Sequence, residues 1–149
     1  MTIEELFGTL QQSIVDVWRY HLETGKYSSH EALNDYYEDM PEEVDRLIED
    51  YMGLYGKIKE YKSIINRSEH ESPVDYLKAL RKLTVDGKDE LIEDDELDSD
   101  IDNVLSLIDT TLYKLKELKE SECSSCDKGE KKKVKTKKHI KDYLKEEEE

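Results

Sequence analysis

Apolar residues recur at steps of three and four in four separate segments, which is the spacing of one face of an α-helix. These segments cover residues 3–23, 29–56, 72–86 and 98–120. Thr2 with Glu5 forms the pattern of a capping box before the first segment, and Ser28 with Glu31 repeats it before the second. The chain therefore begins with two predicted helices joined by a short turn.

The remaining boundaries follow from proline and glycine. Ser72 suits the N-cap of the third helix, with Pro73 at its first position, and Gly87 ends the segment. Pro41 lies inside the second segment, and an internal proline removes a backbone hydrogen bond. We therefore expect a kink, or two abutting helices, at that point. Residues 57–68 fit either a helical continuation or an extended connection.

The charges of the chain divide it into a body and a tail. Residues 86–102 hold ten acidic residues and one lysine, which predicts a solvated loop before a fourth helix capped by Asp98 or Ser99. Residues 121–149 hold nine lysines and eight acidic residues and have no long apolar stripe. Four amphipathic helices predict an all-α four-helix bundle over residues 1–120, followed by a mobile, charged tail.

The overall composition narrows the classes of function. The formal net charge of −15 among 149 residues repels nucleic acid and attracts cations and basic partners. No apolar stretch reaches the length of a membrane span, and the N-terminus lacks the basic region of a signal peptide. We therefore expect a cytoplasmic protein with no membrane partner. No P-loop and no nucleophile-elbow pattern is present.

Four side chains on the first two helices are candidate metal ligands: His21, His30, Asp45 and Glu49. The turn between the helices could bring the two imidazoles to one end of the pair. Asp45 and Glu49 lie four residues apart and share a helix face. However, His30 and Asp45 are fifteen residues apart, which is roughly 22 Å along a helix. They could bind one ion only if two subunits pair antiparallel, which would create two equivalent sites.

The stretch HLETGKYSSHEALNDYYEDMPEEVDRLIEDYMG resembles the Dps branch of the ferritin-like superfamily. In that family a histidine ends the first helix, and H-x14-D-x3-E runs along the second. His30, Asp45 and Glu49 have that spacing here. The resemblance implies a ferritin-like bundle and metal-ligand roles for these three residues and for His21. It also implies a ferroxidase centre shared across a dimer interface. The stretch is also similar to Dps-like proteins of tailed phages, which would place the protein in the host cytoplasm or the virion.

Imidazole and carboxylate ligands suit iron first, with zinc or manganese as alternatives. Under this hypothesis the chain is a Dps-like iron-binding protein, and its enzymatic activity, if it has one, is that of a ferroxidase. Glu49 would bridge two metal ions, and Asp45 and the histidines would be terminal ligands. The alternative is a non-catalytic, phage-encoded dimeric scaffold whose tail docks a protein partner. Either function predicts a homodimer or a larger homo-oligomer.

The tail adds two further candidate sites. Cys123 and Cys126 form a single CxxC, which could be half of a zinc site or a reduced thiol pair. A lysine run could bind nucleic acid or an acidic partner, although the acidic body disfavours DNA. Its members are Lys131, Lys132, Lys133, Lys135, Lys137 and Lys138.

Overall fold

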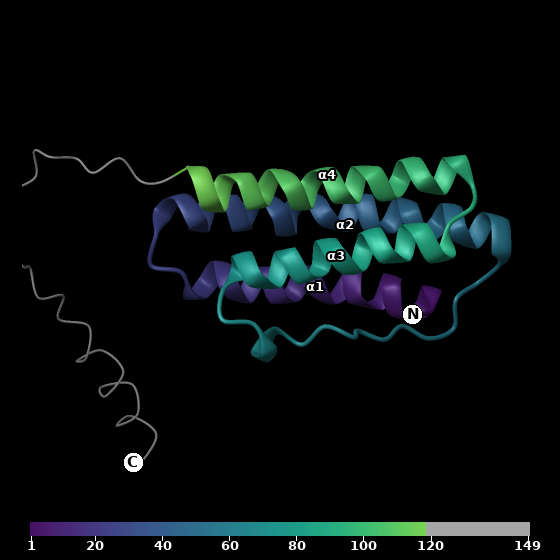
Figure 1. Cartoon of the computed structure of the whole chain (residues 1–149), viewed down its shortest axis with the longest axis horizontal. Coiled ribbons are helices and arrows are strands. Elements are labelled where there is room, and N and C mark those ends of the chain that lie inside the picture. The colour runs from purple at the N-terminus through teal and green to yellow at the C-terminus, as the bar shows by residue number, and fades with distance from the viewer. Residues whose placement is uncertain (119–149) are drawn as a thin grey trace, which may run out of the picture.

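The computed structural model describes residues 1–118, and these residues form a four-helix bundle without strands (Figure 1). The predicted fold class is therefore confirmed. The elements are α1 (Ile3–Glu23), α2 (Tyr27–Tyr55), the short 3-10 turn η1 (Arg67–Glu69), α3 (Pro73–Leu91) and α4 (Asp95–Glu117).

The connections between the helices include one long crossover. α1 and α2 form an antiparallel hairpin, and so do α3 and α4 (Figure 1). The segment 56–72 returns along the whole bundle, so α2 and α3 run in the same direction. α1 packs on α2 and α3, and α4 packs on the same two helices. This segment, called the crossover below, is extended except at η1, so the extended alternative for residues 57–68 is the observed one.

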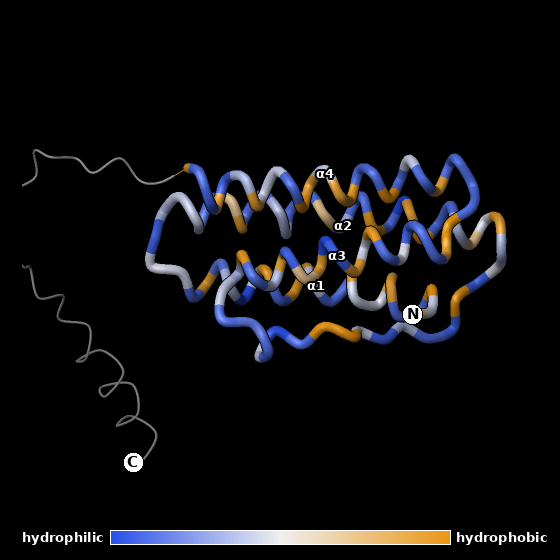
Figure 2. The backbone as a smooth tube through the Cα atoms, in the orientation of Figure 1, coloured by the Kyte–Doolittle hydropathy of each residue, from blue (hydrophilic) through white to orange (hydrophobic). Residues whose placement is uncertain are grey.

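The core is an apolar stripe from each helix, and the apolar positions turn towards the bundle axis (Figure 2). Its largest fully buried side chains include Phe7, Tyr36, Met40 and Tyr76. Burial of such side chains stabilises a bundle by about 1.5–3 kcal/mol each. The stripes predicted from the sequence are therefore the ones that pack the bundle.

Two of the four predicted N-caps are present in the structure. Thr2 and Glu5 form the predicted capping box, and Ser72 caps α3 by accepting from the backbone of Asp75. The predicted capping box of Ser28 and Glu31 is wrong, because α2 begins two residues earlier with Lys26 as its N-cap. The tight α1–α2 turn leaves only residues 24–26 outside the two helices.

Pro41 does not divide the second helix, so the expectation of two abutting helices is wrong. α2 continues through Pro41 as one helix of 29 residues. Met40 and Val44, on either side of the proline, are buried in the core. Packing of this face compensates for the hydrogen bond that the proline cannot make.

The predicted end of α3 and the predicted acidic loop are also wrong. α3 continues through Gly87 to Leu91, and α4 begins at Asp95 with Asp94 as N-cap, not at Asp98. Gly87 is buried against the side chain of Leu6, so the lack of a side chain allows close packing there. Most of the acidic segment is therefore helical, and only residues 92–94 connect the two helices.

The crossover is fastened to α1 by backbone hydrogen bonds. The Lys62 amide donates to the Glu4 carbonyl over 3.2 Å, and the Ile64 amide donates to Oγ1 of Thr9 over 3.0 Å. Gly8 makes this approach feasible, because a Cβ atom at that position would overlap the backbone of Lys62. The crossover thereby covers one face of α1.

Candidate metal centre

His21 and His30 meet at the end of the α1–α2 hairpin, as the turn between them predicts. Their rings are stacked, with centroids 3.6 Å apart and an angle of 27° between the planes. His21 is 6% exposed, and His30 is half-buried. The two residues form a single unit, called the histidine pair below.

Reciprocal hydrogen bonds fix the histidine pair. Nδ1 of His21 lies 2.9 Å from the carbonyl oxygen of His30, and Nδ1 of His30 lies 3.2 Å from the carbonyl oxygen of His21. A carbonyl oxygen only accepts, so both Nδ1 atoms carry the proton. In the neutral rings each Nε2 therefore keeps an available lone pair, which is the form that binds a metal.

Aromatic side chains cover the histidine pair. The Tyr37 ring meets His21 edge-on with centroids 5.0 Å apart, and its hydroxyl donates to Oδ1 of Asn34 over 2.8 Å. The Trp18 ring lies 6.1 Å from that of Tyr37 and is 51% exposed. Sequence analysis missed Tyr37 as a neighbour of the pair, although its position seven residues after His30 places it on the same face of α2.

Asp45 and Glu49 lie farther along α2, exposed to solvent. Both line a shallow groove of about 270 Å³ between α1, α2 and the crossover, together with Pro41 and Tyr61. They share one helix face as predicted, one turn apart. Their carboxylates are open to a partner or to solvent.

The structure does not bring the acidic pair to the histidine pair within one chain. α2 is one helix through both sites, so the separation from His30 to Asp45 stays at roughly 22 Å. Among residues 1–118, no group of three or more His, Cys, Asp or Glu side chains is arranged to hold a metal ion. The histidine pair supplies two nitrogen donors, and further ligands would have to come from elsewhere.

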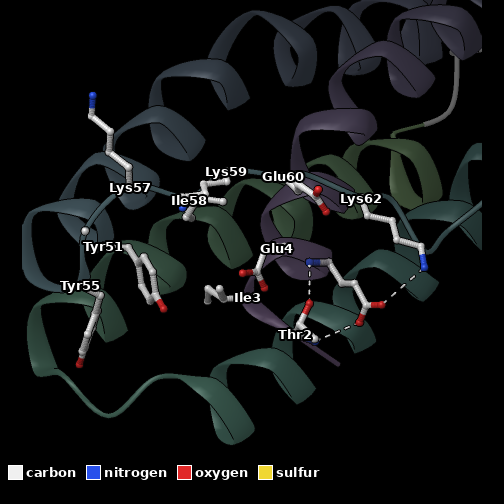
Figure 3. Close-up of a pocket in the computed structure, with 12 residues that line it drawn as sticks. Thr2, Ile3, Glu4, Tyr51, Tyr55, Lys57, Ile58, Lys59, Glu60 and Lys62 are labelled. Carbon is white, nitrogen blue, oxygen red and sulfur yellow. Dashed lines mark hydrogen bonds and ion pairs between the residues drawn. The ribbon is translucent and has the colours of Figure 1, made fainter.

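A groove of about 590 Å³ lies at the opposite end of the bundle, between the start of α1 and the start of the crossover (Figure 3). Tyr51 and Tyr55 form one wall, and three lysines and three glutamates lie around the rim. The first turn of α1 is closed by the Thr2–Glu5 capping box, and Lys62 pairs with Glu5 at 3.9 Å (Figure 3). The rim carries both signs of charge, all on exposed or half-buried side chains.

Two buried carboxyl groups were missed by the sequence analysis. Asp16 is 3% exposed in α1 and accepts hydrogen bonds from Tyr76 and Gln12. Asp100 of α4 is buried, and its Oδ2 atom lacks a hydrogen-bond partner among the described residues. Burial and the neighbouring carboxyl group of Asp50 raise the pKa of Asp100 to about 6. The burial of these two residues could not be predicted from the sequence, because an acidic residue beside an apolar stripe usually faces solvent.

The tail residues proposed as further sites lie outside the described part of the chain, so Cys123, Cys126 and the lysine run stay predictions. Within residues 1–118 the structure contains no helix long and apolar enough to cross a membrane.

In a comparison with protein families, residues 21–115 match a family of unknown function, DUF5856. The match spans more than half of the chain. The chain belongs to the DUF5856 family. Comparison with curated proteins and with solved structures gave no match. The DUF5856 segment begins at His21 and contains His30, Asp45 and Glu49, so all four candidate ligands fall within it.

Proposed function

We propose that this chain is a Dps-like protein that binds divalent metal ions at two equivalent sites shared across a two-fold dimer, with iron as the expected metal. The observation that carries the proposal is the histidine pair. Two imidazoles from different helices are held with both Nδ1 protons engaged by carbonyl groups. Backbone partners of this kind orient metal-binding histidines and fix their tautomer.

The proposed site is completed by a second copy of the chain. Antiparallel pairing about a two-fold axis brings His30 of one protomer towards Asp45 and Glu49 of the other. The axis would cross α2 midway between these positions, near Tyr37 and Pro41. One interface then contains two sites, each with imidazole nitrogens from one chain and carboxylate oxygens from the other.

The surface around the proposed axis suits such an interface. Val15, Trp18 and Leu22 form an exposed apolar stripe on α1, with successive spacings of three and four residues. Trp18 and Leu22 are 51% and 68% exposed, which is unfavourable for a surface that meets only water. The Trp18–Tyr37 contact joins this stripe to the face of α2 that holds the candidate ligands. An apolar centre between two polar sites is the usual anatomy of a homodimer interface.

The connectivity of the bundle supports the ferritin-like part of the proposal. Ferritin-like bundles have one long crossover among four helices, and here the crossover joins α2 to α3. Bundles with other functions also use crossovers, so topology alone does not identify the activity. The ligand types add the chemistry, because imidazole with carboxylate and open positions suits Fe(II) that reacts with oxygen or peroxide.

The exposed stripe also favours the second candidate function, a non-catalytic dimeric scaffold. Such a protein would need the apolar interface but no available imidazole lone pair. The two functions differ in one property: only the first requires Asp45 and Glu49 for metal binding.

The test is a titration of the metal-stripped full chain with Fe(II) under argon, with the molecular mass followed by light scattering. The proposal predicts saturable binding of one or two ions per protomer in a dimer or larger assembly. On exposure to air, Fe(II) should oxidise faster with the protein than in buffer alone. Asp45→Ala and Glu49→Ala should abolish binding, whereas Asp39→Ala, an exposed acid on the same helix, should not. A dimer without saturable binding would support the scaffold function instead.

A further inference from the structure

A polar pocket of about 480 Å³ lies between α1 and the crossover, away from the histidine pair. Gln12, Asp16 and Arg19 line it from one face of α1, since their spacing is four and then three residues. Asn66 and Arg67 line it from the crossover, near η1. The volume is within the range of small-molecule sites in proteins.

The floor of this pocket is a buried carboxylate. The Asp16 side chain is 4% exposed, and its Oδ2 accepts from the Tyr76 hydroxyl over 2.8 Å. Its Oδ1 accepts from Nε2 of Gln12 over 3.1 Å. The nearest guanidinium, that of Arg19, is 4.0 Å away and 58% exposed, so this charge is only loosely paired. Each carboxylate oxygen can accept more than one hydrogen bond, so Asp16 can accept from a ligand as well.

The walls of the pocket carry two guanidinium groups. Arg67 is held over the Tyr20 ring, with Cζ 5.0 Å from the centroid, and pairs with Glu23 through Nη1 at 2.7 Å. The two remaining nitrogens of its fork can donate to another acceptor. Arg19 approaches from the α1 side. The guanidinium groups of Arg19 and Arg67 come from different elements, and both are suited to donate hydrogen bonds to a carboxylate or phosphate.

The charges of the pocket select one class of ligand. The charged residues that line the pocket are Asp16, Arg19 and Arg67, so it holds opposite charges at separate places. Glu23, which lies outside the lining, offsets part of the charge of Arg67 through their ion pair. A simple anion would meet the field of a chain with a net charge of −15. A zwitterion avoids that penalty, because its ammonium group can donate to Asp16 while its carboxylate accepts from the arginines.

We propose that the pocket formed by Asp16, Arg19 and Arg67 binds a small amino acid as its zwitterion. The ligand bridges α1 and the crossover and leaves the histidine pair untouched. Bound ligand thereby fastens the crossover to the helix that it covers. This site is independent of the metal function proposed above.

The test is a titration of the ¹⁵N-labelled, metal-free full chain with L-serine, followed by two-dimensional NMR. We expect saturable shifts confined to the side-chain signals of Gln12 and Arg19 and to the amides of residues 63–68. Acetate and methylammonium, which each carry one of the two charges, should bind at least about tenfold more weakly. Equal binding of acetate would overturn the zwitterion proposal, as would an absence of saturable shifts.

Variants distinguish a binding site from a contact between α1 and the crossover that is merely structural. Arg19→Gln removes a largely exposed charge, so it should keep the fold and weaken serine binding about tenfold. Arg81→Gln is the matched control, because Arg81 is also partly exposed but pairs with Asp109 on another face. Asp16→Asn should remove the preference for serine over acetate. Unchanged serine affinity in Arg19→Gln would contradict the proposal.

Discussion

The imidazoles of His21 and His30 hold each other in place, because Nδ1 of each ring donates to the backbone carbonyl of the other residue. The contact joins the last turn of α1 to the first turn of α2, at a helix start that lacks a side-chain cap. The pair therefore closes the hairpin and also leaves both Nε2 atoms available.

This mutual contact predicts strong energetic coupling between the two residues. His21→Ala and His30→Ala should each destabilise the metal-free protein, and the double variant should differ from their sum by about 0.5–2 kcal/mol. Urea denaturation of the four proteins of this cycle measures the coupling. As a control, His21→Ala and Tyr55→Ala at opposite ends of the bundle should add within about 0.5 kcal/mol. Additive histidine effects would mean that the stack contributes nothing.

Gly8 is predicted to be required for the packing of the crossover. Gly8→Ala places a methyl group against the backbone of Lys62, which cannot move without breaking its bond to Glu4. We expect a loss of about 1–3 kcal/mol in unfolding free energy. Gly53→Ala is the matched control, because Gly53 is exposed in α2 with open space around it. That change should stabilise the protein by about 0.5–1 kcal/mol. Equal effects of the two changes, measured by thermal and urea unfolding, would contradict this role of Gly8.

Asp100 predicts how stability depends on pH. Its pKa is raised to about 6 in the folded chain from 3.8, so the folded state binds the proton more tightly than the unfolded state. The contribution of Asp100 to stability therefore falls as pH rises from about 4 to about 6, and it is lost above that range.

Asp100→Asn should therefore stabilise the protein at pH 8 and flatten this pH dependence, because the amide is neutral and can donate to Asp50. Urea denaturation at pH 4, 5, 6 and 8 measures the effect. Asp89→Asn, at an exposed position of α3, serves as the control. If Asp100→Asn is as stable as the wild type at pH 8, burial does not penalise this carboxylate.

Trp18 is expected to lie at the dimer interface. Trp18→Glu places a charge in the apolar stripe and should convert the proposed dimer to a monomer with unchanged helix content, because the side chain is already half exposed. Light scattering and circular dichroism measure the two properties. Tyr113→Glu, at a similarly exposed aromatic position on α4, should leave the assembly intact. If the Trp18→Glu variant still forms a dimer, the interface lies on another face of the bundle.

The sequence was sufficient to predict the helical bundle but not to predict where every helix begins and ends. The apolar stripes, the Thr2–Glu5 capping box and the Ser72–Pro73 start follow from local chemistry, and the structure has them. Pro41 does not divide α2 into two helices and Gly87 does not end α3, because their neighbours pack against distant residues and tertiary packing overrides local preference. No local signal shows that Lys88 reaches Asp98 and Asp102 to join α3 and α4.

The candidate site was predictable in part. The short turn predicted the meeting of His21 and His30, and helix periodicity predicted the shared face of Asp45 and Glu49. The cover of Tyr37 and the buried Asp16 depend on contacts between helices far apart in the chain. The dimer that would unite the two halves of the site stays a prediction.

Complementation between two inactive variants tests the central claim most directly. His30→Ala removes the nitrogen half of each site, and the double variant Asp45→Ala/Glu49→Ala removes the carboxylate half. Neither variant alone should bind Fe(II) saturably. When the two are dissociated, mixed in equal amounts and reassociated, half of the dimers are mixed, and each mixed dimer has one intact site.

Anaerobic Fe(II) titration of that mixture should recover about a quarter of the wild-type number of sites. Recovery at that level would establish that His30 of one chain and the acidic pair of the other bind the same ion. A mixture that binds no more Fe(II) than its separate components, although mixed dimers form, would contradict a metal site shared across the dimer.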